Sequence, residues 1–503
     1  MPRESSKTPF VHSPFLVVTA ILLMLLTGCF SVEQNLVSGR KRAFGYTWAQ
    51  EVQIGQEADP QIVAQYGLYD DEAVADYVTR LGQELLEVSH LRRPDTPAQM
   101  ANTPFYFRVL DSPVVNAFAL PGGYIYVTRG LLSHLQNEAQ LAMVLGHEIG
   151  HVVGRHSSKR AATQQIGQLL TVGGALGAQA VLGGNAAQEV LNTGGTAVGL
   201  MFLSYGRDDE RESDRLGVEY AAIEGFKSGE GAHFFRSLQR IQQKSGQSIP
   251  SFLSTHPDPG EREVTIQRLA EDWAQRVEMN RVGMEDYLDI VNGLTVGDDP
   301  RQGYVENGYF YHPVMKFQFP VPSGWQVINE PTRVVLVGPE QAAVTVFTLA
   351  QDANTAQAAG EAFAGQEGLT VIEQGNTRTN GLAAYNVLAT AVSEQQEYQL
   401  LARYVELGGT VFSFQSFTLK TSFDTHSNDM YRSSNGFAQL NDRSKIDVQP
   451  TSMAIVPAPR SGTFQSFLPA QMPRGFEPID FAIMNQVNLD TQIPRGYPLK
   501  LPR

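Results

Sequence analysis

Two histidines, four residues apart in an apolar stretch, constrain the fold of this chain more than any other feature. The segment Gly146-His-Glu-Ile-Gly-His151 has apolar residues around it at helical spacing, which predicts a buried helix. Helix positions i and i+4 lie about 40° apart, so His147 and His151 can point at one ion with Glu148 beside them. The alternative is a helix whose histidines are satisfied elsewhere in the core. Burying such groups without a partner is costly, which favours a metal site. The apolar neighbours are Leu141, Val144, Leu145 and Val152.

A third ligand has to come from elsewhere in the chain. Glu210 and Asp214 stand at i and i+4 of a predicted helix some sixty residues downstream, hence on one face. We expect Glu210 to bind the metal and Asp214 to accept a proton from a ligand histidine. The alternative is a solvated acidic face, because Asp208, Asp209 and Glu212 are acidic too.

Cysteine content narrows the kind of metal site. Cys29 is the only cysteine, which excludes a disulfide framework and cysteine-based zinc fingers. Zinc suits imidazole and carboxylate ligands, and a catalytic zinc keeps one position for water, whose pKa falls towards ~7. Glu148 can then take the proton and deliver it to a leaving amine. We therefore predict one Zn²⁺ per chain.

A loop further along offers one more histidine. His256 stands in Ser254-Thr-His-Pro257, and Arg262 follows where another helix begins. His256 can hydrogen-bond the oxyanion of a tetrahedral intermediate, or cover the metal and gate it. Arg262 can pair with Asp214 or another site carboxylate. The alternative is that His256 caps the start of the helix. His156 is expected off the face of His151 and without a role.

The N-terminus has the pattern of a bacterial export signal. Residues 1–28 contain an apolar run of about twelve residues, too short for a membrane span and typical of a signal peptide. The run ends in Leu26-Thr-Gly-Cys29, which resembles a lipobox and implies lipidation of Cys29. By analogy with such lipoproteins, Phe30 rather than Asp suggests the outer membrane. A plain signal peptide is the alternative.

Length and composition predict several globular domains. The chain has 503 residues, or about three domains' worth, and 42% hydrophobic residues exclude a mainly disordered chain. The net charge is −14 without a strongly basic stretch, which makes nucleic acid an unsuitable partner. We expect an α+β protein in three parts: a mostly helical domain with a small sheet over 29–300, an antiparallel α+β domain over 304–440 and a small module over 445–503. The Gly/Ala-rich segment 161–200 is either a pair of closely packed helices or a mobile, membrane-touching hairpin.

Four motifs together resemble a known family. Asn116-Ala-Phe-Ala-Leu-Pro-Gly-Gly123, HEIGH at 147–151, ERESD at 210–214 and STHPDPGER at 254–262 occur in the order and spacing of the HtpX-like and CAAX prenyl protease family of zinc metallopeptidases, peptidase family M48. The chain is most similar to its periplasmic lipoprotein branch, over residues 45–280.

This resemblance implies a fold and a set of roles. It implies a gluzincin domain with His147, His151 and Glu210 on zinc, Glu148 as base and His256 near the catalytic water. Asn116, Ala117, Phe118 and Ala119 correspond to the family's substrate-binding strand, where an extended peptide adds by β-augmentation. Ser213 stands where the family usually has Ala. The membrane helices of the prenyl proteases and the tetratricopeptide tail of periplasmic relatives are missing.

The tail carries two other modules. Phe317–Trp325 weakly resembles the start of PsbP-like domains. Residues 445–503 resemble a degenerate LysM module, which implies binding of peptidoglycan sugars. The alternative is a β-rich cap that stabilises the preceding domain.

These observations predict a zinc endopeptidase of the bacterial cell envelope. It would be lipid-anchored, face the periplasm and cleave misfolded or stalled envelope proteins. One alternative is a self-inhibited chaperone or assembly factor for outer-membrane proteins. Another is a peptidoglycan-binding protein that carries a vestigial protease.

Overall fold

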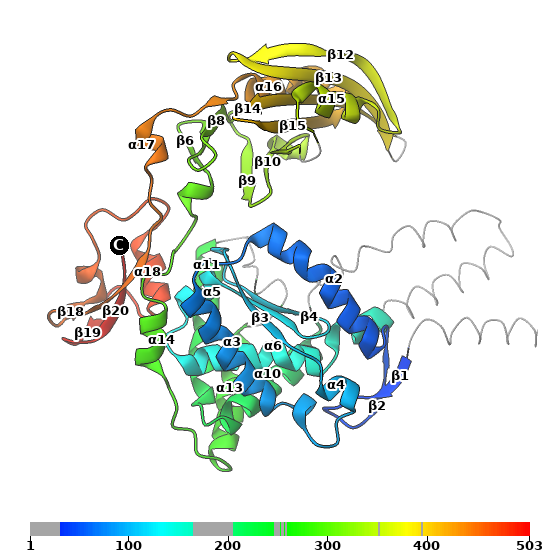
Figure 1. Ribbon diagram of the computed structural model, residues 1–503. Helices are drawn as coiled ribbons and strands as arrows, with labels where there is room; N and C mark the ends of the chain where they lie inside the picture. Colours follow the sequence, from blue (N-terminus) through cyan, green and yellow to red (C-terminus); the bar gives the residue numbers. More distant parts are fainter. Residues whose placement is uncertain are drawn as a thin grey trace, which may run out of the picture.

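The structure is a computed structural model, shown in Figure 1. It describes residues 31–163, 205–245, 252, 256, 259–350, 353–393 and 396–503. The predicted signal peptide with Cys29 and most of the Gly/Ala-rich segment lie outside these residues. Within them, no helix is long and apolar enough to cross a membrane.

The first helices follow from their caps and apolar faces. Helix α2 (Trp48–Tyr66) begins with a capping box between Thr47 and Gln50. Helix α3 (Glu72–Glu87) begins after Asp71, whose side chain accepts from the N–H of Val74. The apolar positions predicted for α3 are all buried, and they form part of the main core: Val74, Tyr77, Val78, Leu81 and Leu85.

A three-stranded sheet lies against these helices. Its strands are β3 (Tyr106–Leu110), β4 (Ala117–Leu120) and β5 (Tyr124–Thr128), in the order β3-β5-β4. Strand β5 runs parallel to β3 and antiparallel to β4. The tight turn between β4 and β5 requires glycine, since φ is +78° at Gly122 and +98° at Gly123. Among the described strands, β4 lies at one edge of this sheet.

Two helices pack closely at the centre of the same domain. They are α6 (Glu138–Val153), capped by Asn137, and α10 (Arg207–Ile223). A Cβ on Gly146 would lie 3.0 Å from the Cα of Gly217, so both helices need small residues where they cross. The sequence predicts a helix that begins at Asn137 and runs to about Lys159. Helix α6 instead ends at Val153, because the chain turns at Arg155, where φ is +56°.

The remaining elements complete the first domain. Helices α11 and α13 pack on each other and on α6 and α10, and a hairpin of β1 and β2 precedes α2. Their bounds are β1 (Ser31–Gln34), β2 (Lys41–Phe44), η1 (His90–Arg92), α4 (Ala98–Ala101), α5 (Arg129–His134), η2 (Ser228–Glu230), α11 (Gly231–Ser245), α13 (Pro259–Ala274) and α14 (Met284–Ile290).

The middle domain is a separate antiparallel structure. Its seven-stranded sheet has the order β12-β13-β14-β15-β11-β10-β9, and a four-stranded sheet, β16-β8-β7-β6, lies beside it. Helix α15 (Ala356–Ala364) covers one face of the large sheet and α16 (Phe423–Asn435) packs on the other. The strands are β6 (Tyr304–Glu306), β7 (Tyr309–His312), β8 (Phe317–Pro320), β9 (Gln326–Glu330), β10 (Arg333–Val337), β11 (Ala343–Leu349), β12 (Leu369–Thr379), β13 (Leu382–Ser393), β14 (Gln396–Leu407), β15 (Thr410–Leu419) and β16 (Ala438–Gln439). The predicted α+β class is confirmed.

The C-terminal module returns to the first domain. After α17 (Arg443–Ile446), strand β17 (Met453–Pro457) pairs with β20 (Pro498–Pro502), and η6 (Phe464–Phe467) and α18 (Pro478–Met484) lie between them in sequence. Strands β18 (Gly462–Thr463) and β19 (Gln492–Ile493) form a second pair. The module's buried residues belong to the same hydrophobic cluster as those of the first domain.

Candidate metal centre

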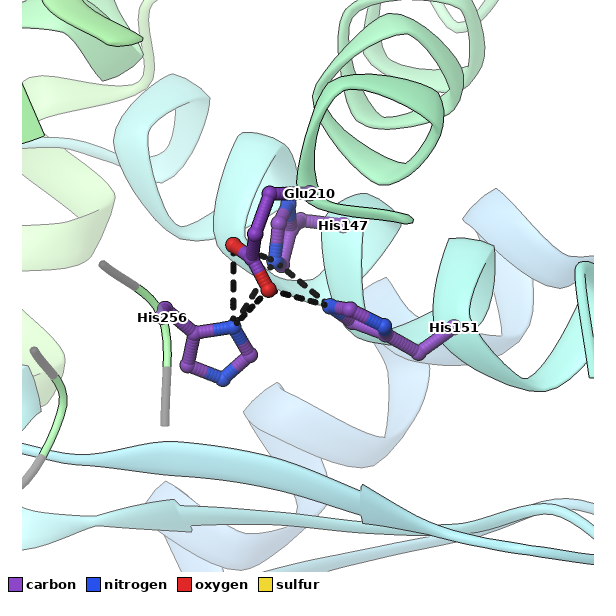
Figure 2. A group of neighbouring side chains, drawn as sticks. All are labelled: His147, His151, Glu210 and His256. Carbon is purple, nitrogen blue, oxygen red and sulfur yellow. Dashed lines mark hydrogen bonds and ion pairs between the residues drawn. The ribbon is translucent and has the colours of Figure 1, made fainter. Parts of the chain in front are cut away.

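Four side chains with metal-binding atoms meet in the first domain. They are His147, His151, Glu210 and His256, all buried, and one ligand atom from each lies within 4.8 Å of the others. Figure 2 shows the three imidazoles and the carboxylate turned toward one common point. The structure brings the three predicted ligands together as a group that could hold a metal ion, and His256 lies among them.

Helix α6 brings the first two ligands together. The Nε2 atoms of His147 and His151 lie 3.0 Å apart, as expected for i and i+4 on one helix face. Burial is the largest influence on His151 and lowers its pKa well below the usual value, and the positive neighbours lower it further. The neutral imidazole is the form that binds metal ions.

Helix α10 supplies the carboxylates. Glu210 Oε2 lies 3.6 Å from His147 Nε2, and Glu210 Oε1 lies 3.5 Å from His151 Nε2. Asp214 Oδ1 lies 3.0 Å from the other ring nitrogen of His147, where a carboxylate fixes the tautomer. Arg262 of α13 donates to both oxygens of Asp214, at 2.9 and 2.7 Å, and its Nη1 lies 3.0 Å from Glu210 Oε2. Arg262 was expected to pair with Asp214 or another site carboxylate, and it contacts both Asp214 and Glu210.

Glu148 differs from these carboxylates. It is fully buried, and neither of its oxygens has a hydrogen-bond partner among the described residues. Burial raises its pKa. Burial also acts on Asp214, but Arg262 and His147 outweigh it and lower the pKa of Asp214 to about 2. Such opposite environments suit Glu148 to proton transfer and Asp214 to a permanent charge.

His256 reaches the cluster from the segment before α13. Its Nδ1 lies 2.9 Å from Glu210 Oε1 and 3.3 Å from His147 Nε2. Its Nε2 lies 3.6 Å from Glu148 Oε1. The ring stacks on Phe252, with 4.6 Å between centroids. His256 therefore contacts both Glu210 and Glu148.

The predicted substrate strand lies at the sheet edge beside α6. Among the described strands, β4 pairs only with β5. Ala117 and Ala119 belong to the main core, whereas Phe118 stacks on Tyr126 in a smaller cluster near α2, with 4.9 Å between centroids. The backbone N–H of Asn116 donates to Thr128 at 3.1 Å.

Three residues around His151 were not predicted. Tyr205 stacks on the His151 ring, with 3.9 Å between centroids. His156 Nδ1 lies 2.9 Å from His151 Nδ1, and His156 Nε2 lies 3.0 Å from Glu212 Oε2. The sequence carries little signal for Glu212, because it stands two residues from both Glu210 and Asp214 and on a helix such positions do not share a face.

Comparison with known families matches this geometry. Residues 76–270 match Peptidase family M48, a stretch that contains both helices of the cluster, Glu148 and His256. The first domain, which contains this stretch, is named the M48 domain after this match. The M48 domain has the ligands expected for zinc: two imidazoles on one helix and a carboxylate on another. The unpaired, buried Glu148 beside them also fits a metal centre that acts on water.

Relatives share this part of the chain. The chain is 32% identical over 215 residues to the Beta-barrel assembly-enhancing protease of Escherichia coli (strain K12), which covers 42% of each protein. It is 26% identical over 255 residues to the Mitochondrial metalloendopeptidase OMA1 of Schizosaccharomyces pombe, covering 50% of this chain and 69% of that protein. The chain thus spans less than half the length of the first of these relatives.

Solved structures resemble part of the chain at low similarity. Cyanobacterial PsbP (CyanoP) from Synechocystis sp. PCC 6803 aligns with 26% of this chain and 91% of its own, at 18% identity and a TM-score of 0.22. This likeness is too low to bear on function.

Proposed function

We propose that this protein is a zinc-dependent endopeptidase that hydrolyses peptide bonds of misfolded or stalled envelope proteins. His147, His151 and Glu210 would hold the zinc. The proposal rests above all on Glu148, a buried carboxylate with no hydrogen bond to the described residues, which lies beside His256 of the cluster. A structural metal centre has no use for such a group, which is costly to bury.

The site residues divide the chemistry between them. Zinc, when bound, supplies Lewis acidity and lowers the pKa of water. Glu148 accepts a proton from the attacking water and returns it to the amine of the departing peptide. Its raised pKa suits this exchange, since a base with a pKa nearer neutrality also returns its proton readily. Asp214 and Arg262 hold His147 and Glu210 in place.

Strand β4 would hold the substrate. It is an edge strand and lies against α6, the helix that carries Glu148. An extended peptide can pair with the backbone of such an edge, and selectivity then depends little on side chains. This mode suits a protease that takes unfolded segments of many sequences.

The setting follows from the N-terminal signal and the relatives. The lipobox-like Leu26-Thr-Gly-Cys29 supports a lipid anchor in the outer membrane, with the protein facing the periplasm. The name of the Escherichia coli relative, Beta-barrel assembly-enhancing protease, supports envelope proteins as substrates.

Replacing Glu148 with Gln tests the proposal. The variant should bind zinc as the parent does and cleave casein at least about 100-fold more slowly, since general acid–base catalysis is lost. Parent protein treated with a chelator is the control and should also lose cleavage. Cleavage by Glu148→Gln at the parent rate would contradict the proposal.

A second candidate is a self-inhibited protein with a chaperone or assembly role. It is favoured by His256, whose Nδ1 stands among the ligand atoms and completes a group of four. If His256 covers the zinc, His256→Ala should cleave casein faster than the parent. If the Glu148→Gln variant corrects the envelope defect of cells that lack this protein, the chaperone role is supported.

The third candidate is a peptidoglycan-binding protein. A pull-down on purified peptidoglycan, with and without residues 445–503, tests the LysM-like module.

A further inference from the structure

The turn after α6 places a second histidine behind a metal ligand. On a continuous helix, residue 156 would face away from His151. Arg155 instead adopts φ +56°, and His156 folds back under α6. The His156 ring is fully buried and lies so close to Gly154 that a Cβ there would be 2.4 Å from His156 Nε2. The backbone thus makes room for this one ring.

The contacts of His156 define where its protons lie. His151 turns Nε2 toward the cluster, 3.5 Å from Glu210 Oε1, so its Nδ1 carries the proton when it binds metal. That N–H donates to His156 Nδ1 at 2.9 Å. The hydroxyl of Ser213 lies 3.3 Å from the same nitrogen and can donate as well. His156 Nε2 is then the protonated nitrogen, and it donates to Glu212 Oε2 at 3.0 Å.

Each histidine of α6 is supported by a carboxylate of α10, His147 directly and His151 through the ring of His156. His147 faces the carboxylate of Asp214 directly, at 3.0 Å. His151 faces the carboxylate of Glu212 through His156. Both carboxylates stand on α10, two residues apart, so one helix supports both histidines of α6.

The N-terminal hairpin, residues 31–44, contacts the same carboxylate. Arg42 of β2 donates to Glu212 Oε2 at 3.1 Å. Arg155 holds the other side of the hairpin, since its Nη1 donates to Glu33 of β1 at 2.6 Å. Its Nε donates to Glu51 of α2 at 2.7 Å. The hairpin is thereby bound to Arg155, the residue of the turn that positions His156.

We propose that His156 and Glu212 are positioning residues that fix the tautomer and orientation of His151 for zinc, and that the N-terminal hairpin supports them through Arg42. The proposal rests on the proposed zinc centre. Because residues 31–44 follow the predicted lipid attachment site directly, the support of His151 begins next to the membrane anchor.

Zinc affinity of the full chain, measured by competition with a chelator, tests the pair. His156→Phe keeps a ring over Gly154 and removes both nitrogens. We expect zinc to bind at least about 10-fold more weakly, as for other partners of ligand histidines. Glu212→Gln keeps an acceptor without charge and should lose less. Glu219 lies on the same helix as Glu212 but forms its ion pair with Arg93, away from the site. Glu219→Gln is therefore the matched control and should bind zinc as the parent does.

Activity against pH and the kcat/KM split separate positioning from folding. His156→Phe, saturated with zinc, should lower kcat with little change in KM and shift the pH profile, whereas Glu219→Gln should change neither. Parent-like zinc affinity in both His156→Phe and Glu212→Gln would overturn the proposal. If His156→Phe does not fold, Glu212→Gln decides alone. A parent that binds no zinc would instead refute the proposed function.

A double-mutant cycle tests the part of the hairpin. Arg42→Ala should weaken zinc binding about two- to threefold in the parent and have no effect in Glu212→Gln, since coupled residues are not additive. Equal losses in both backgrounds would overturn the role of the hairpin and leave that of His156.

Discussion

At the scale of single residues, Arg262 is the group on which most of the site's charge depends. It is 4% exposed, donates to Asp214 and contacts Glu210. Arg262→Met keeps the volume but leaves two carboxylates buried without their cation. We expect a loss of about 3–5 kcal/mol in the free energy of unfolding, measured with urea on the zinc-free protein. Arg211→Met is the control, because Arg211 is exposed on α10 and should change stability by less than about 0.5 kcal/mol. Equal losses in both variants would contradict this account.

Residues of the site could be predicted where a short-range pattern carries them. His147 with His151, and Glu210 with Asp214, each follow from helical spacing. His256 follows from the family resemblance, but its place among the ligand atoms needed the fold. His156 could not be predicted, because its position depends on the positive φ of Arg155, for which an arginine gives no signal.

At the scale of elements, the crossing of α6 and α10 sets the geometry of the centre. A Cβ on Gly217 would lie 2.9 Å from both the backbone N of His147 and the backbone O of Met143. Gly217→Ala should force the helices apart and lower stability by about 1–3 kcal/mol. It should also weaken zinc binding, because two ligands stand on one helix and one on the other. Gly375→Ala in β12, with open space around it, is the control for calorimetry and zinc affinity. Unchanged zinc affinity in Gly217→Ala would contradict this view.

Helix α5 makes the domain sensitive to acid. Burial lowers the pKa of His134 to about 4, although its hydrogen bond to Gly130 opposes this. The unfolded chain, with an ordinary histidine pKa of about 6.5, binds the proton first as the pH falls, so stability decreases from about pH 6.5 downward. Between pH 7 and 4.5 this amounts to about 2 kcal/mol. His134→Gln should reduce the loss by that amount in urea titrations at the two pH values. An equal loss in parent and variant would contradict it.

Elements with clear alternation were predicted, and polar ones were not. Alternating apolar residues predict strands over 333–337, 383–391, 398–406 and 410–418. Strand β10 has these bounds, and β13, β14 and β15 differ from them by at most two residues at either end. Strand β12 was missed because its second half, Glu373–Thr379, is almost entirely polar; it is an edge strand and much of it faces solvent. Helix α16 was missed for the same reason, since few of its residues are buried.

At the scale of the whole molecule, the chain leaves the M48 domain and comes back beside its point of exit. Thr295 forms a bridge with Ser452, and the N–H of Val296 donates to the carbonyl of Thr451 at 2.8 Å. The turn-rich segment 293–303, which the sequence predicts as a linker between domains, is thus held by backbone hydrogen bonds. The returning module then fastens the loop before α6, where the ammonium of Lys500 donates to the carbonyls of Ser133 and Leu135. The C-terminal module is therefore joined to the start of the HExxH helix, whereas the middle domain has a core of its own.

This arrangement predicts opposite outcomes for two deletions. Removing residues 304–447 and joining the ends with a short Gly/Ser linker should leave the M48 domain folded, because the flanking segments are already hydrogen-bonded neighbours. Its zinc affinity should match that of the full chain, and its melting temperature should change by only a few degrees.

Removing residues 451–503 should instead unfold the M48 domain. That deletion takes away Met453, Phe464, Phe481 and Leu499, all fully buried in the shared core. At roughly 2 kcal/mol for each side chain, their loss approaches the total stability of a domain. Circular dichroism melts of both deletions check this. A stable, zinc-binding protein without residues 451–503 would show that the M48 domain folds without the C-terminal module. Binding of peptidoglycan would then be the better explanation of the module.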